Sequence, residues 1–479
     1  MSKINFAGYD TGGFFDEMIS EQGEVRPHYA RFKERMQKMD WKKLNALRFA
    51  TDRAQLSMGM TFNVYSDNQG SERILPLDII PRIISGEDWE EMEKGLRQRI
   101  VALNLFIDDL YHEQKILKDK VIPTDLVMSS ATFLKACVGL NPPQKVWCHI
   151  TGSDLIRGGD GKFYVLEDNL RCPSGVSYML ENREILKRTL PDIFEKLSVR
   201  PVSDYSHLLR DTLESLVPDR EQPTIVVLTP GAYNSAYFEH AYLAQQMGAE
   251  LVEGRDLVVQ NDMVYMLTTK GLQKVDVIYR RVDDDYIDPL VFNKDSLLGT
   301  KGLFGAYLKG NVVLVNAPGT GVADDKAVYA YVPKIIKYYL GEDMLLPNVE
   351  TYICADPKEC AHVIENIADL VIKQTDASGG YGMLIGPKST KAEQEEFVRK
   401  IKANPRNYIA QPMISLSRVP TLVDEGIEGR HVDLRPYILY GKEIKIIPGA
   451  LTRVALKKGS LVVNSSQGGG SKDTWVLNK

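Results

Sequence analysis

LVIKQTDASGGYGML, residues 370–384, is the stretch of this sequence that decides the fold. Its apolar start is typical of a buried strand that presents Lys373, and a glycine-rich turn then leads into a second strand. Gly379, Gly380 and Gly382 allow the backbone to approach an anion closely, while Lys373 supplies a positive charge. The stretch therefore predicts a turn that holds polyphosphate. Taken alone, it fits an ordinary hairpin with a solvated lysine equally well.

Two other glycine-containing segments do not predict phosphate binding. In the sequence Gly386-Pro387-Lys388-Ser389, proline replaces the second glycine of a Walker A loop. The segment GTGVAD at residues 319–324 lacks the third glycine of a dinucleotide-binding fingerprint. Both interpretations are set aside.

The segment VLEDNLR places Glu167 and Asn169 two residues apart on an expected strand, so their side chains point to the same face. A carboxylate and an amide oxygen are hard ligands of the kind that Mg²⁺ prefers. Asp154, on the preceding expected strand, adds a third candidate ligand. The alternative is a surface hairpin with scattered polar residues, which is the more frequent origin of such a short pattern.

Two arginines occupy strands that are otherwise apolar. Arg435 lies in HVDLRPY and Arg453 in ALTRVAL, and Asn464 ends the expected strand SLVVN at residues 460–464. An arginine in a buried strand is costly unless it meets an anion, so both predict recognition of phosphate or carboxylate. Salt bridges to acidic residues within the sheet are the alternative.

Composition indicates a globular enzyme that acts on small molecules. The 479 residues are 44% hydrophobic and 26% charged, and the net charge of −5 does not suit a nucleic-acid or membrane-surface binder. The five cysteines form no CxxC pair, and we expect a reducing, cytoplasmic location. We also expect neither a signal peptide nor a membrane-spanning helix.

The order of expected elements suggests four regions. Residues 1–145 are helix-rich, with one helix over 89–118, and residues 146–200 hold strands at 146–150 and 162–169. Residues 201–320 form a small α/β lobe with a β-α-β unit and further strands at 275–281 and 311–316. Residues 321–479 begin with a helix over 325–345. The predicted class is mixed α/β. The oligomeric state is left open.

Together these motifs resemble the ATP-grasp superfamily, in which a lysine and a glycine loop hold ATP phosphates and the backbone near a hinge, here Gln411-Pro412, holds adenine. In the ordinary order of that superfamily, the ExN magnesium motif comes last. Here ExN lies upstream, in GSDLIRGGDGKFYVLEDN at residues 152–169. The whole chain, including LTPGAYNSAYFEH, YRRVDDDYIDP and NAPGTGVADDK, thus resembles the circularly permuted ATP-grasp proteins related to glutathionylspermidine synthase.

The resemblance implies roles for particular residues. ATP would be bound by Lys326, Lys373, Ser378, Gly379, Gly380, Tyr381, Gly382, Gln411, Pro412 and Asn464; Mg²⁺ by Asp154, Glu167 and Asn169; and the reacting groups by Arg171, Arg435 and Arg453. Further candidates are Ser174, beside the acyl-phosphate, and Asp324 and Asp325, which suit a helix cap as well as ligand contact. Asp283–Asp285, behind Arg280 and Arg281, suit a cationic amine or the incoming carboxylate, and a solvated loop is the more common explanation of such a run. Asn234 and Ser235 lie near a helix start that suits an anionic substrate.

The implied activity is ATP- and Mg²⁺-dependent ligation of a small-molecule carboxylate to an amine through an acyl-phosphate. No separate amidase domain with a nucleophilic cysteine is recognised, so no amidase activity is expected, and the resemblance does not identify the amine as spermidine. Two alternatives remain open. A phosphotransferase on the same fold would release ADP without forming an amide, and a non-catalytic protein would bind nucleotide as part of a larger assembly.

Overall fold

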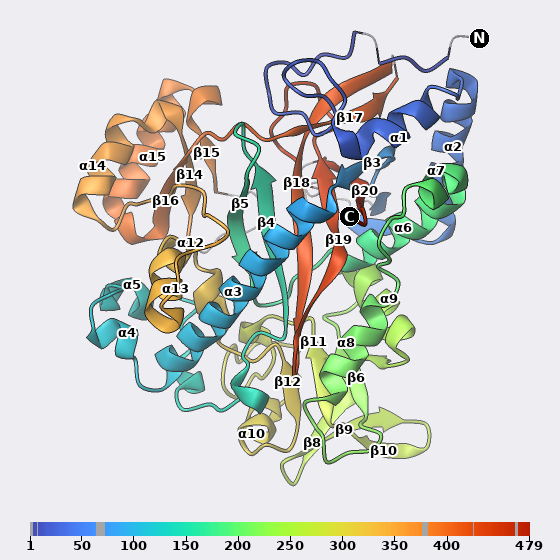
Figure 1. The fold of residues 1–479 in the computed structure, drawn as a ribbon. Coiled ribbons are helices and arrows are strands. Elements are labelled where there is room, and N and C mark those ends of the chain that lie inside the picture. Colours follow the sequence, from blue (N-terminus) through green and yellow to red (C-terminus); the bar gives the residue numbers. More distant parts are fainter. Residues whose placement is uncertain (1–2, 7, 64–71, 376–381, 425, 465–467) are drawn as a thin grey trace.

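The computed structural model describes residues 3–6, 8–63, 72–375, 382–424, 426–464 and 468–479. It is a mixed α/β structure, as predicted, with a large central sheet, a small sheet that carries Lys373, and a parallel α/β lobe (Figure 1).

The central sheet joins strands from three distant parts of the chain. Its order is β3 (Leu77–Ile84), β20 (Gly470–Val476), β19 (Ile444–Val454), β18 (Gly426–Tyr440), β4 (Ile150–Arg157) and β5 (Phe163–Asn169), and β17 (Arg418–Val423) also pairs with β18. The pair β3–β20 is parallel and the other pairs are antiparallel. The expected strands around Glu167 and the arginine strands therefore share one sheet. The N-terminal region was expected to be helix-rich, yet its strand β3 joins this sheet.

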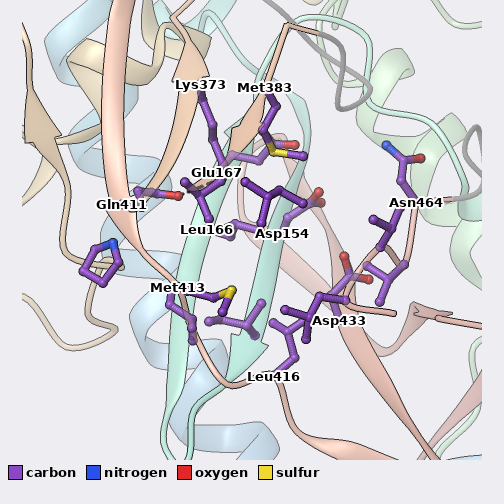
Figure 2. Close-up of a pocket in the computed structure, with 18 of the residues that line it drawn as sticks. Asp154, Leu166, Glu167, Lys373, Met383, Gln411, Met413, Leu416, Asp433 and Asn464 are labelled. Carbon is purple, nitrogen blue, oxygen red and sulfur yellow. Dashed lines mark hydrogen bonds between the residues drawn. The ribbon is translucent and has the colours of Figure 1, made fainter. Parts of the chain in front are cut away.

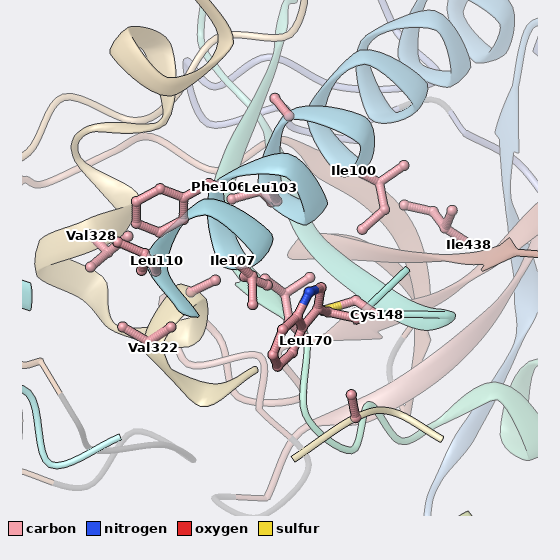
Figure 3. Close-up of a cluster of buried hydrophobic side chains, with 14 of the residues drawn as sticks. Ile100, Leu103, Phe106, Ile107, Leu110, Cys148, Leu170, Val322, Val328 and Ile438 are labelled. Carbon is pink, nitrogen blue, oxygen red and sulfur yellow. The ribbon is translucent and has the colours of Figure 1, made fainter. Parts of the chain in front are cut away.

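Helix α3 (Gly86–Tyr111) crosses the centre of the molecule and supplies much of the core. Its buried apolar residues recur every three or four positions, so they form one stripe, and Figure 3 shows this stripe against side chains from β18, the β5 end and the helices after residue 320. Ser85 caps the helix by accepting a hydrogen bond from the Asp88 N–H.

The predicted helix over 89–118 is wrong at its C-terminal end. Helix α3 ends at Tyr111, and α4 (Lys115–Lys118) follows after Gln114, whose φ of 54° is left-handed. The Asp109 carboxylate accepts hydrogen bonds from the backbone of Lys115 and Ile116, at 2.9 and 3.0 Å. This side chain satisfies N–H groups that a continuous helix would have bonded internally.

The small sheet has the order β13 (Tyr352–Ile353), β16 (Tyr408–Pro412), β14 (Leu370–Gln374) and β15 (Leu384–Ile385), all antiparallel. Helices α14 (Pro357–Glu365) and α15 (Lys391–Ala403) belong to the same lobe (Figure 1). Thus the expected strand that presents Lys373 is confirmed as β14. It pairs with β16, which carries Gln411 and Pro412.

The α/β lobe contains a parallel sheet of order β12 (Val313–Val315), β11 (Val277–Arg280), β6 (Ile225–Leu228) and β7 (Glu250–Val252). Helix α9 (Tyr237–Met247) connects β6 to β7, which confirms the predicted β-α-β unit. Three antiparallel strands extend the lobe: β8 (Leu257–Gln260), β9 (Met263–Thr268) and β10 (Gly271–Lys274).

The other regular elements surround these sheets. They are α1 (Pro27–Met36), α2 (Trp41–Ser57), β1 (Thr61–Asn63), β2 (Glu72–Ile74), α5 (Thr124–Met128), α6 (Val176–Thr189), α7 (Pro191–Lys196), α8 (Tyr205–Glu214), α10 (Leu303–Leu308), α11 (Gly321–Asp324), α12 (Lys326–Tyr329) and α13 (Val332–Leu340). The helix predicted over 325–345 is thus two shorter helices that end at Leu340, and the Asp325 carboxylate caps α12 by accepting from the Ala327 N–H.

Two predicted strands are corrected. Residues 146–149 precede β4 and form no strand, because side chains satisfy their backbone: Asn104 Oδ1 accepts from the N–H groups of Trp147 and Cys148, and Asn316 Oδ1 accepts from those of His149 and Ile150. Residues 460–464 also lie outside any strand. The segment that follows forms β20, in which Trp475 and Val476 are buried.

Candidate active site

A pocket lies between the small sheet and the central sheet. It is lined by Asp154, Ile156, Leu166, Glu167, Lys326, Val371, Lys373, Gln374, Met383, Ile385, Gln411, Pro412, Met413, Ile414, Leu416, Asp433, Arg453, Leu461, Val462, Val463 and Asn464. The first four of these residues come from β4 and β5, and the others come from residues 326–464. The structure therefore brings the upstream ExN segment and the downstream lysine segment to one place.

The pocket has a charged part and an apolar part. Figure 2 shows Lys373 and Glu167 near one end, and Met413 and Leu416 near the other. Apolar side chains from Ile414 and residues 461–463 also line the pocket. Such a division suits a ligand with a flat apolar group and an anionic tail.

Lys373 extends into the charged part from β14. Its Nζ donates a 2.7 Å hydrogen bond to Gln411 Oε1. Burial lowers the pKa of Lys373 to about 8, opposed by the nearby Glu167 and Asp154 carboxylates and assisted by Lys326. Because the charged form is costly to bury, a bound polyphosphate would stabilise this ammonium group.

Glu167 and Asn169 lie on the same face of β5, as predicted. In the β4–β5 ladder Glu167 is paired with Asp154, and Lys326 Nζ lies 3.6 Å from Glu167 Oε2. The Asn169 amide donates to Asp154 Oδ1 at 3.4 Å, so its own oxygen takes no part in that contact. Glu167 can therefore contribute a carboxylate oxygen, and Asn169 an amide oxygen, to a cation.

The two predicted arginines converge on a buried carboxylate. Arg435 binds Asp154 through Nε at 2.5 Å and Nη2 at 2.8 Å, and Arg453 Nη2 binds the same carboxylate at 2.6 Å. Arg453 also pairs with Asp433. Burial alone would raise the pKa of Asp154, but the two guanidinium groups hold it far below its usual range. The alternative left open by the sequence, salt bridges within the sheet, is therefore present.

A second, smaller pocket adjoins the charged part. It is lined by Thr132, Glu167, Asp168, Asn169, Arg171, Gly321, Asp324, Asp325, Lys326 and Thr375. Because Glu167 and Lys326 line both pockets, the second pocket lies beside the charged end and not the apolar end. Arg171 Nε donates to Asp324 at 2.7 Å. Burial raises the pKa of Asp324 to about 6, although Arg171 opposes the shift.

Several predicted candidates have structural partners. Asp325 accepts from Arg406 Nη2 at 2.6 Å in addition to its capping role. In the acidic run, Asp284 pairs with buried Arg280, whereas Asp283 is exposed and lies 3.9 Å from Arg171. Arg281 pairs with buried Glu239 and also donates to the Pro173 carbonyl. Asp284, Arg280 and Arg281 are therefore paired within the packing, whereas Asp283 is not.

The remaining predicted residues divide into three groups. Ser378, Gly379, Gly380 and Tyr381 lie outside the described residues, whereas Gly382 is described and has a left-handed φ of 67°. Ser174 does not line either pocket, and its carbonyl accepts from Arg435 and Tyr437. The Asn234 side chain accepts from the Ala236 N–H just before α9, which is a local turn contact. Ser235 precedes the same helix.

Sequence reasoning missed several residues of the main pocket. Asp433 lies two positions before Arg435 on β18, and Met413 and Leu416 follow the Gln411-Pro412 hinge. The two-residue spacing of Asp433 and Arg435 was a usable signal, since alternate strand residues share a face. Gln374 follows Lys373 directly, and no pattern in the sequence distinguishes it.

The residues at the charged end fit a magnesium–nucleotide complex. Among the described residues no three His, Cys, Asp or Glu side chains gather as a complete metal site. Glu167 and Asn169 provide two hard oxygens on one face, and Mg²⁺ commonly takes one or two protein ligands with phosphates and water. The donor set therefore suits a cation whose other ligands arrive with a polyphosphate.

The chain belongs to the circularly permuted ATP-grasp type 2 family, whose model matches residues 81–455. An uncharacterized protein of Synechocystis sp. is 57% identical over 476 residues, covering 99% of both chains. An uncharacterized protein of Mycobacterium tuberculosis is 51% identical, over 98% of this chain and 86% of its own length.

One further relative and one solved structure of similar fold carry descriptive names. A Frankia alni protein with the provisional name glutamate–cysteine ligase 2-3 is 40% identical over 98% of this chain, which spans only 54% of that protein. The structure of a glutathione synthetase-like effector from Globodera pallida, in its apo form, has a TM-score of 0.59 and 11% identity, covering 92% of this chain and 98% of that one. The latter shows a shared fold. In the described parts of the present chain, no helix has both the length and the apolar character needed to cross a bilayer.

Proposed function

We propose that this protein is an ATP- and Mg²⁺-dependent ligase that joins a carboxylate to an amine through an acyl-phosphate. The observation that carries the proposal is the meeting of Lys373 from β14 with Glu167 from β5 and Lys326 from α12 in one pocket. The two lysine ammonium groups suit phosphate oxygens, and the Glu167 carboxylate suits Mg²⁺. The apolar region beside them suits a nucleobase.

Each charged group has a part in the proposed reaction. Lys373 and Lys326 would bind phosphate oxygens, and Glu167 and Asn169 would hold Mg²⁺, which neutralises phosphate charge when bound. Arg453, which lines the pocket, and Arg435 behind it would stabilise charge on the transferring phosphoryl group. The contacts of Asp154 support a role other than metal binding. Its carboxylate would hold these two arginines in place.

The second pocket is the proposed place for the acid and amine. The substrate carboxylate attacks the γ-phosphorus, ADP leaves, and the amine then displaces phosphate from the acyl-phosphate. Arg171 lies beside Glu167 and Lys326 in this pocket, so it is placed to meet a carboxylate that approaches the phosphate end. Most of the catalysis would come from positioning and electrostatic stabilisation.

The comparisons support a ligase but do not select its substrates. The Globodera pallida effector is called glutathione synthetase-like, and the Frankia alni protein bears a ligase name. Because this chain spans 54% of the Frankia alni protein, the activity in that name could reside in the part outside the match, and we do not transfer glutamate or cysteine. All five cysteines are free thiols, which supports the cytoplasmic location expected from the sequence.

Isothermal titration with a non-hydrolysable ATP analogue tests the nucleotide site. We expect Mg²⁺-dependent binding that the double variant Glu167→Ala, Asn169→Ala loses. Acid substrates can then be screened with ATP and hydroxylamine, which would trap an acyl-phosphate as a hydroxamate. ADP and hydroxamate formed together support a ligase, ADP without hydroxamate supports a phosphotransferase, and no binding at millimolar nucleotide supports neither enzyme.

A further inference from the structure

The Lys373 side chain is hydrogen-bonded to Gln411, whose side chain is fixed by a second hydrogen bond. Gln411 is buried, and its side-chain amide is engaged at both ends. Its Oε1 accepts from Lys373 Nζ at 2.7 Å, and its Nε2 donates to Thr351 Oγ1 at 3.0 Å. The Gln411 side chain is therefore committed to protein contacts.

Thr351 continues this chain of hydrogen bonds toward the central sheet. Its hydroxyl donates to the Val349 carbonyl at 2.9 Å. The Val349 N–H in turn donates to the Val165 carbonyl at 3.0 Å, and the Val165 N–H donates to the Pro347 carbonyl at 2.8 Å. The segment before β13 is thus tied to β5.

The last residue of this series of hydrogen bonds, Val165, lies two positions from Glu167 on β5. Tyr329 reinforces the junction, because its hydroxyl donates to the Val165 carbonyl and accepts from the Val349 N–H at 2.9 Å. The hydrogen bonds therefore lead from β5, which carries Glu167, to the ammonium group of Lys373 on the other lobe. A hydrogen-bonded partner behind a binding group restricts its rotamers before ligand arrives, so less freedom is lost on binding.

We infer that Gln411 and Thr351 are positioning residues that hold Lys373 for the nucleotide phosphates and fix it relative to Glu167. The inference rests on the proposed nucleotide site. It assigns these two residues no contact with the phosphates, since both act through Lys373.

The test combines single variants with a double-mutant cycle. Thr351→Val removes the hydroxyl and keeps the branched shape, Gln411→Met removes both side-chain hydrogen bonds, and Lys373→Met removes the group on which they act. Thr421→Val is the matched control, because Thr421 is buried on β17, does not line the pocket, and donates to the carbonyl two residues earlier, just as Thr351 does. Affinity for a Mg²⁺–ATP analogue is measured by calorimetry, and folding by thermal melting.

We expect Thr351→Val and Gln411→Met each to weaken binding by about three- to tenfold, and Thr421→Val to leave it unchanged. Gln411→Glu, which retains an acceptor for Lys373, should bind more tightly than Gln411→Met. In the Lys373→Met background, Thr351→Val should weaken binding of the analogue by less than about twofold, since the effects of coupled residues are not additive. If Gln411→Met fails to fold, Thr351→Val alone completes the cycle.

Two results would overturn the inference while leaving the proposed function intact. One is wild-type affinity in both Thr351→Val and Gln411→Met. The other is an equal loss from Thr351→Val with and without Lys373, which would mean that Thr351 acts elsewhere. Failure of the wild-type protein to bind nucleotide would instead overturn the proposed function together with this inference.

Discussion

Asp154 and Arg435 form a two-point ion pair across the central sheet, with atoms 2.5 and 2.8 Å apart, although 281 positions separate them in the chain. The side chain of Asp154 is 1% exposed and that of Arg435 is 12% exposed, so solvent screens the pair little. Because β4 and β18 are neighbouring strands, this pair links the upstream segment to the downstream segment. The ion pair therefore connects the two parts of the permuted chain beside the pocket, which Asp154 lines.

Asp154→Ala should destabilise the folded protein. Among the described residues, removing this carboxylate leaves Arg435 without an acidic partner and Arg453 with Asp433 alone. Breaking a buried ion pair by removing one partner typically costs about 3–5 kcal/mol. Urea unfolding would measure the loss. Asp424→Ala, which breaks the exposed pair with Arg48, is the control and should show no comparable change. Equal effects of the two variants would contradict this prediction.

Lys373 should make nucleotide binding sensitive to pH. The pKa of its ammonium group is lowered, chiefly by burial, to about 8, so the group is charged below that pH and neutral above it. Affinity for a Mg²⁺–ATP analogue should be nearly constant below pH 7. Above pH 8 it should fall by about tenfold per unit, until the higher pKa of the bound state is reached.

Calorimetry at pH 7, 8 and 9 would measure this dependence. In two buffers of different ionisation enthalpy, it should also report proton uptake on binding at pH 9. Lys373→Met should bind more weakly and without the fall between pH 8 and 9, which separates Lys373 from the ionisation of the analogue. The same fall in this variant would assign the dependence to another group.

Local patterns in the sequence indicated two candidate segments. Lys373 stands in an apolar strand, and Glu167 and Asn169 share a face by their spacing, although each pattern alone also fits an ordinary hairpin. The partners of these residues could not be predicted from such patterns. Thr351 reaches Gln411 through the pairing of β13 with β16, and Asp154 reaches Arg453 through the order of the central sheet. Such contacts depend on tertiary arrangement, which local patterns do not contain.

The errors in secondary structure have the same origin. The apolar run at 146–150 has strand character, but Asn104 and Asn316 satisfy its backbone from other elements. The helix expected over 89–118 ends early because Asp109 caps a second helix. In each case a polar side chain overrides the local propensity by offering the backbone another partner. Lys326 was assigned to the site by resemblance, and only the fold places it beside Glu167.

Glu17 should contribute stability that is lost in acid. Burial favours a raised pKa, but Arg82 and Arg157 outweigh it and lower the pKa of Glu17 from 4.5 to about 2. A lowered carboxylate pKa stabilises the fold above the unfolded value, and this contribution disappears as the pH falls from about 4.5 through 2. The shift corresponds to about 3 kcal/mol as an order of magnitude. Glu17→Gln should therefore be less stable than wild type at pH 6.

Urea unfolding at pH 6, 5, 4 and 3 would follow the difference between Glu17→Gln and the wild type. That difference should narrow toward pH 3, as the wild-type carboxylate loses its advantage. Asp16, whose pKa is raised to about 6 by burial, is present in both proteins, so its own titration largely cancels in the comparison. A difference that stays constant over this range would mean that Glu17 acts through packing and not through its charge.

Glu167 and Asp168 are neighbours on β5 that both line the second pocket but differ in exposure and in partners, so their substitutions should separate binding from folding. Glu167 faces both pockets and is 29% exposed. Asp168 is 1% exposed and accepts from Arg99 Nε and Nη2 and from Ser153 Oγ. Glu167→Ala should retain the wild-type melting temperature and lose the Mg²⁺-dependent part of nucleotide affinity, by about 10–100-fold. Asp168→Ala should lower the free energy of unfolding by about 3–5 kcal/mol, because it leaves a buried guanidinium without its carboxylate.

Calorimetry with and without Mg²⁺, beside urea unfolding of both variants, would distinguish the two roles. Below the unfolding temperature of Asp168→Ala, its folded fraction should bind the Mg²⁺–ATP analogue within a few-fold of wild type, since Glu167 is still present. The assignment of Glu167 fails if its alanine variant binds as tightly as the wild type and responds equally to Mg²⁺. In that case the cation would be held by other oxygens at the charged end, and Asp154, released from one of its arginines, would be the next carboxylate to test.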